Sequence, residues 1–140
     1  RLLVSDHKNP ELGYEGSHIQ KINGYYYIFL VHSLRDRWMR TEACFYSDSL
    51  EGEFTGGDVL CDDRGYCGQG VAQGGIVDTP DGKWYAMLFQ DSGAVGRIPI
   101  LLPVTWKDHF PFFWTERTCA GRNRGSQYQT RIYLSAISGK

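Results

Sequence analysis

Short hydrophobic runs alternate with polar turn residues through the first part of the chain. Residues 18–21 and 25–32 form two such runs, and Asn23-Gly24 between them is the strongest short sequence signal for a tight β-hairpin. Alternation resumes over residues 41–46, and residues 47–54 combine a turn with a short outer strand. The pattern predicts an antiparallel meander of four strands.

The same plan returns in the second half of the chain. Residues 75–78 and 83–90 predict two strands, joined by a turn at 79–82 that contains Pro and Gly. After a loop at 91–96, residues 97–104 predict a further strand. We predict no helix of useful length, so the expected fold class is all-β.

The two units are copies of one pattern. Residues 15–30 align without a gap on residues 73–88, at an offset of 58 (85 − 27), which matches Gly16 with Gly74, Gly24 with Gly82 and Tyr27 with Tyr85. Residues 55–72 between the copies are glycine-rich and acidic, and we expect a loop there. Glu15 and Gln73 head the two copies, at positions that the alignment makes equivalent and where an active site would lie.

Repeated β units of this kind usually form propellers or solenoids, and a closed propeller normally needs about four to eight blades. Two units cannot close such a ring. Either the chain associates through its open faces or it is a piece of a longer protein. Because the chain begins with Arg1 rather than Met, we expect the second.

Composition agrees with this fold and excludes several functions. Aromatic residues make up 14% of the 140 residues and 17 are glycine, which suits pleated strands and tight turns. The net charge of −1, with both signs interspersed, provides no basic face for nucleic acid and no polybasic membrane anchor. The chain also lacks a membrane-spanning apolar run and a signal-peptide pattern. The compartment stays open, with extracellular and periplasmic locations among the alternatives.

The cysteines do not have the spacing of a zinc site. Cys61 and Cys67 either close a short disulfide loop or remain thiols. We expect Cys44 and Cys119 to be thiols.

Three segments, residues 13–27, 47–52 and 77–85, resemble glycoside hydrolase family 43. That family contains β-xylosidases and α-L-arabinofuranosidases on a five-bladed β-propeller. The resemblance runs from about residue 12 to 111 and implies two four-stranded blades, at about 13–54 and 72–113, within a partial glycosidase domain over 1–113.

The resemblance also implies a catalytic role for Glu15. The element Glu-Gly-x-His-x-x-Lys at residues 15–21 matches the family segment that carries the general acid. An inverting glycosidase needs this acid and a separate carboxylate about 6.5–9.5 Å away that activates water. In the family, the base Asp and a second, acid-tuning Asp lie on blades outside this chain, so we expect the isolated chain to be inactive.

The resemblance assigns binding roles to three further residues. Arg97 resembles the family arginine that contacts sugar hydroxyls, and a guanidinium fork suits paired hydroxyls. Gln73 stands where many relatives carry a channel histidine that is sometimes linked to calcium, so we assign no metal and no cofactor, and expect a hydrogen bond to sugar or water instead. His18 either contacts substrate or only packs and pairs within its strand.

The last segment departs from the family. Removing one base from the Trp114 codon makes residues 114–132 compatible with the family sequence, so we hypothesise that residues 114–140 are an out-of-frame, loosely ordered tail. The leading interpretation is a fragment of an inverting glycosidase that acts on xylose- or arabinose-containing glycans, with the missing blades of its own chain as partners. The alternative is a non-catalytic propeller module that binds carbohydrate or protein.

Overall fold

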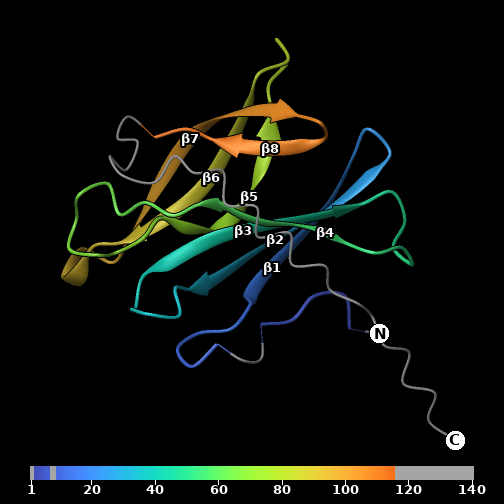
Figure 1. Cartoon of the computed structure of the whole chain (residues 1–140). Helices are drawn as coiled ribbons and strands as arrows, with labels where there is room; N and C mark the ends of the chain where they lie inside the picture. Colours follow the sequence, from blue (N-terminus) through green and yellow to red (C-terminus); the bar gives the residue numbers. More distant parts are fainter. Residues whose placement is uncertain (1, 7–8, 116–140) are drawn as a thin grey trace, which may run out of the picture.

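The structure, a computed structural model, describes residues 2–6 and 9–115 (Figure 1), so the predictions for the tail beyond Thr115 lie outside the described residues. Eight strands form two four-stranded antiparallel sheets in the orders β1-β2-β3-β4 and β5-β6-β7-β8. The first sheet contains β1 (Glu15–Ile22), β2 (Tyr25–Ser33), β3 (Arg40–Ser47) and β4 (Thr55–Leu60). The second contains β5 (Ala72–Asp78), β6 (Trp84–Asp91), β7 (Arg97–Lys107) and β8 (Phe110–Phe113), with a short 3₁₀ turn at Gly93–Val95. The prediction of two four-stranded meanders is confirmed.

The outer strand of the first sheet lies later in the chain than predicted. Strand β4 spans Thr55–Leu60, so the prediction of a strand ending near residue 54 and of a loop from 55 is wrong. The glycines that suggested a loop are needed for strand contact: a Cβ on Gly56 would lie 2.0 Å from the backbone oxygen of Cys44 in β3. Only a residue without a side chain allows β4 to approach this closely.

The turns correct the alignment of the two copies. In the first hairpin, Ile22 pairs with Tyr25 around Asn23-Gly24. In the second, the Thr79 N–H donates to the Lys83 oxygen, which leaves one more residue in the turn. Equivalent residues are therefore 57 apart before the turn (79 − 22) and 58 apart after it (83 − 25).

This extra turn residue changes which residues head the copies. Val31 of β2 corresponds to Phe89 of β6, which lies 58 residues later. Glu15 pairs with Val31, whereas Ala72 pairs with Phe89. The expectation that Glu15 and Gln73 occupy equivalent positions is therefore wrong, and Glu15 corresponds to Ala72. Gln73 corresponds to Gly16, and both have positive φ, +66° and +58°.

One core joins the two sheets, which lie over one another in Figure 1. It is formed by side chains of β2, β3, β4 and the second sheet, among them Tyr27, Phe29, Cys44, Leu60, Ile76, Leu88 and Ile100. The other face of the first sheet has a separate cluster of Ile28, Leu30, Ala43 and Phe45, against which Leu3, Val4 and Tyr14 pack. Each face of the first sheet is therefore covered.

The second sheet has one exposed apolar face. Strand pairing places Val77, Met87, Leu101 and Phe112 on it, with 47%, 57%, 56% and 42% of their surface exposed. We call this the open face. The open face corresponds to the face of the first sheet that packs against the second sheet. Met87 on the open face corresponds to Phe29 of β2, which is fully buried in the core between the sheets.

Two further observations concern the described residues only. Cys61 and Cys67 do not form the disulfide that was one of the sequence alternatives. No helix in residues 2–6 and 9–115 has the length and apolar character required to cross a membrane.

Candidate active site

Glu15 is the first residue of β1 and lies at the surface. It is exposed, and no hydrogen bond or ion pair joins its carboxylate to another described residue. The ladder with β2 is irregular between Glu15 and His18, and Gly16 in this bulge has a left-handed φ of +58°. The bulge leaves Gly16 and Ser17 outside the regular pairing, and Glu15 pairs with Val31 on its far side.

The second sheet supports this bulge through Gln73. A Cβ on Gly16 would lie 2.7 Å from the Gln73 side-chain nitrogen, so the amide of Gln73 fills the space that a larger residue at position 16 would need. The structure therefore brings Gln73 against the residue that follows Glu15.

A buried carboxyl group that sequence reasoning missed lies behind Gln73. Glu42 of β3 is 0% exposed, and its Oε2 accepts a 2.6 Å hydrogen bond from the Gln73 backbone N–H. Burial raises the pKa of Glu42 well above its ordinary value, partly opposed by hydrogen bonds from the Gln73 and Gly74 backbones. The available signal was a Glu inside a predicted strand next to the small apolar Ala43.

Arg97 lies on the second sheet at the head of β7, where it pairs with Asp91. Its Nε is 3.5 Å from Asp91 Oδ1, and its guanidinium carbon is 4.5 Å from the centre of the Phe89 ring. Arg40 of β3, which the sequence did not single out, donates to the other oxygen of Asp91. The Arg97 side chain is 60% exposed, so donors not directed at Asp91 face solvent.

His18 and Arg97 differ in their relation to Glu15. His18 lies in β1, the same strand as Glu15, and is exposed. It pairs with Phe29 of β2 and lies beside Gly75 of the second sheet. Among the described residues, no contact joins Arg97 to Glu15. The structure thus gathers Glu15, His18 and Gln73 at the contact between β1 and β5, and leaves Arg97 in a separate cluster with Asp91.

Gln73 stands at the position that the family resemblance sometimes links to calcium. Its side chain lies against Gly16, and residues 2–6 and 9–115 contain no group of three or more His, Cys, Asp or Glu side chains placed to hold a metal ion.

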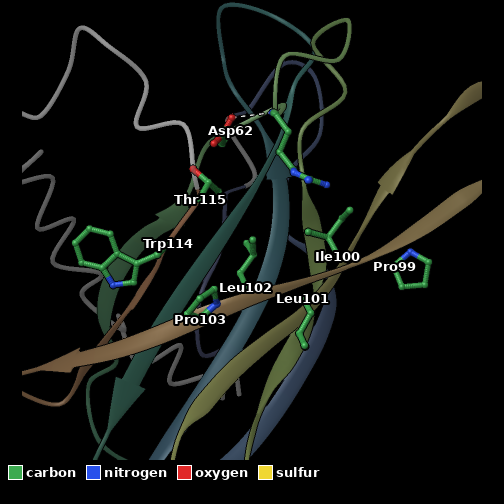
Figure 2. A pocket seen from close by; sticks show the side chains of 9 residues that line it. Asp62, Pro99, Ile100, Leu101, Leu102, Pro103, Trp114 and Thr115 are labelled. Atoms are coloured by element: carbon green, nitrogen blue, oxygen red, sulfur yellow. Dashed lines mark hydrogen bonds between the residues drawn. The ribbon is translucent and has the colours of Figure 1, made fainter.

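A groove on the second sheet lies apart from these residues. It is lined by residues 99–103 of β7, Asp62, Arg64, Trp114 and Thr115 (Figure 2). It exists because β8 pairs with β7 only over Val104–Lys107, which leaves the earlier part of this edge uncovered. Trp114 closes one end, with its backbone N–H bonded to the Pro103 oxygen at 3.0 Å. None of the predicted site residues lines the groove.

Comparison with known proteins relates the chain to glycoside hydrolases, although no family model matches it. A putative β-xylosidase from Xylanibacter ruminicola is 30% identical over 99 residues, 69% of this chain and 18% of that protein. A solved bifunctional GH43-CE protein from Bacteroides eggerthii is 43% identical, with a TM-score of 0.72, over 83% of this chain and 15% of its own length.

A second solved structure supports the same relationship. It is an engineered GH43 glycoside hydrolase that displays both endo-xylanase and exo-arabinofuranosidase activity, and it is 30% identical over 74% of this chain, with a TM-score of 0.63. It too is much longer, since the match covers 19% of it. The chain therefore spans less than one fifth of each of these relatives.

Proposed function

Because the chain is homologous to a segment of glycoside hydrolase family 43 enzymes, we propose that it supplies the general acid of an inverting glycosidase. Enzymes of this family are five-bladed β-propellers, and the two sheets of this chain are two of the blades. The names of the relatives refer to xylosidase, xylanase and arabinofuranosidase activities, which favours xylose- or arabinose-containing glycans as the substrate.

The position of Glu15 carries this proposal. Its carboxyl group is exposed at the end of β1, beside a bulge held by the neighbouring sheet, so it can reach a ligand without breaking a contact. In the proposed reaction, the protonated Glu15 donates its proton to the glycosidic oxygen as that oxygen leaves the anomeric carbon. A water molecule attacks the opposite face of the sugar and gives its proton to a base carboxylate, which we place on a blade outside this chain.

Three other residues are proposed to bind the sugar. Arg97 offers guanidinium N–H donors to hydroxyl groups, and its contacts with Asp91 and Phe89 restrict the direction of the fork. Gln73 and His18 lie beside the Glu15 bulge, where an amide and an imidazole can each donate to or accept from a hydroxyl group.

The open face supports the proposal that further blades are partners. Met87 on this face corresponds to Phe29, and Phe29 is buried because the second sheet covers it. By the same repeat, the next blade would cover Met87. An exposed apolar face of this kind marks an interaction site in soluble proteins.

The decisive experiment is Glu15→Gln in the complete enzyme that contains this segment. A general acid matters most when the leaving group is poor, so turnover of xylo-oligosaccharides should fall by about 100-fold or more. Turnover of a dinitrophenyl glycoside, whose leaving group needs no proton, should fall far less. Glu11→Gln, an exposed glutamate in the same segment, is the matched control and should leave both rates unchanged.

Two results would contradict the proposal. Unchanged oligosaccharide turnover in the Glu15→Gln enzyme would remove Glu15 from the mechanism. Glycan binding without any turnover by the parent enzyme would favour the non-catalytic module. Clear hydrolysis of a nitrophenyl xyloside or arabinofuranoside by the purified 140-residue chain would show that no outside base is needed.

A further inference from the structure

Glu42 is a carboxyl group with no place in the proposed chemistry and an unusual location. It lies in the interior of the first sheet, paired with Val31 on one side and Leu60 on the other, and it is 0% exposed. Burying a carboxyl group is costly unless it is hydrogen-bonded, and a hydrophobic residue would normally fill such a position. A carboxyl group at such a position requires a specific contact.

That contact is with the bulge at the head of β5. Gln73 and Gly74 fall between Ala72 and Gly75, where the ladder with β6 shifts register and their backbone N–H groups leave regular pairing. Glu42 Oε2 accepts from the Gln73 N–H at 2.6 Å. Gln73 also has a left-handed φ of +66°, which is uncommon for a residue other than Gly, Asn or Asp. Glu42 therefore stabilises a backbone conformation that Gln73 would not otherwise favour.

The bulge in turn determines the surroundings of Glu15. The Gln73 side chain occupies the space beside Gly16, the residue after Glu15. Glu15 and Glu42 pair with the same residue, Val31, from opposite sides, so their Cα atoms are two strand spacings, about 10 Å, apart. Glu42, Gln73 and the Glu15 bulge thus form one continuous set of contacts across the two sheets.

We propose that Glu42 is a positioning residue of the candidate active site, which holds Gln73 in its left-handed conformation against Gly16 and thereby fixes the location of Glu15. The role of Glu42 in catalysis rests on the proposed function of Glu15, whereas its effect on Gln73 does not.

Three variants of the 140-residue chain test the contact itself. Glu42→Leu removes the acceptor, whereas Glu42→Gln keeps one and suits the buried site, because burial raises the pKa of Glu42 and favours its neutral form. Cys44→Ala is the control: Cys44 is fully buried two residues along β3, and its loss affects the core without touching Gln73.

Amide hydrogen exchange measured by NMR provides the readout. In Glu42→Leu, the Gln73 and Gly74 amides should exchange at least about tenfold faster relative to the amides of β6, because their acceptor is gone. Glu42→Gln should restore most of this protection, and Cys44→Ala should leave the ratio unchanged. Equal protection in Glu42→Leu and the parent chain would overturn the proposal.

A fourth variant covers the case in which Glu42→Leu does not fold. Gln73→Gly keeps the backbone N–H for Glu42 and suits a positive φ, but removes the side chain that lies against Gly16. In the complete enzyme it should lower kcat by about tenfold or more while its thermal stability is equal or higher. A purely structural role would not separate turnover from stability in this way, and an unchanged KM for the glycan would distinguish positioning from loss of the sugar contact proposed for Gln73.

Kinetics of the complete enzyme separate the two proposals. If Glu42→Leu lowers kcat with little change in KM, and Glu42→Gln restores it, the positioning role is supported. If Glu15→Gln is inactive but Glu42→Leu and Gln73→Gly both keep normal kcat, the positioning role fails and the proposed function stands. If Glu15→Gln keeps full turnover, the proposed function itself fails.

Discussion

Replacing Leu88 with Ala tests whether the two sheets form one cooperative unit. Leu88 of β6 is 3% exposed and lies in the core that joins both sheets. The change removes three carbons, worth about 0.8 kcal/mol each in transfer free energy, and leaves a cavity, so we expect a loss of about 2.5–5 kcal/mol. Because the core is shared, unfolding should stay a single transition with a lower denaturation midpoint.

Hydrogen exchange shows where this free energy is lost. If the core joins the sheets, the slowest amides of β2 and β3 should lose as much protection as those of β6 and β7. Met87→Ala is the matched control, because Met87 is adjacent in sequence but 57% exposed on the open face, and it should cost less than about 1 kcal/mol. Unchanged protection in the first sheet of the Leu88→Ala chain would refute the reasoning, since the sheets would then unfold independently.

Three further predictions concern stability. Burial raises the pKa of Glu42, so its contribution to the free energy of unfolding is complete below the unfolded pKa of about 4.3 and falls as pH rises, by at most about 1.4 kcal/mol per pH unit. Glu42→Gln should remove this pH dependence in urea titrations. Parallel pH profiles of the variant and the parent chain would contradict the prediction. Gly74→Ala should prevent folding, as judged by circular dichroism, because the added Cβ would lie 1.9 Å from a backbone oxygen of β6. Gly75→Ala should fold, because the nearest atom to its added Cβ lies 3.4 Å away. Equal folding of the two variants would refute this prediction. The Tyr27 hydroxyl donates to the His109 backbone oxygen at 2.8 Å, and burial raises the pKa of Tyr27 to about 12. Tyr27→Phe should therefore lower the free energy of unfolding by about 0.5–1.5 kcal/mol in chemical denaturation and remove one late-titrating tyrosine from the ultraviolet pH titration. An unchanged titration would count against this prediction.

Local signals were sufficient for most of the fold. The Asn23-Gly24 turn and the alternating strands around it are encoded in neighbouring residues, so their positions follow from the sequence. Strand β4 was missed because Gly56 looks like a loop residue in isolation, and its need for close contact with Cys44 is visible only in three dimensions. The extra turn residue before Lys83 escaped notice because an ungapped alignment still matched glycine with glycine.

The site was less predictable because its contacts join distant parts of the chain. Family resemblance singled out Glu15 and Arg97, but nothing local indicates that Arg40 and Asp91, which are 51 residues apart, share an ion pair. Glu42 was overlooked for a related reason. A strand glutamate is normally read as solvent-facing, and its partner, the Gln73 backbone, belongs to another sheet.

The repeat explains how a site can be divided among blades. Gln73, from the second sheet, supports the bulge after Glu15, which heads the first sheet. By the correspondence of the copies, the residue that heads the second sheet is Ala72, and the element that would support the bulge after it belongs to the blade that we propose for the open face. By this repeat, we expect each strand head to be supported by the following blade. One support of the proposed acid, the Gln73 side chain against Gly16, is therefore contained in this chain, whereas we place the base on another blade. For this reason we expect the isolated chain to hold Glu15 in place without turnover.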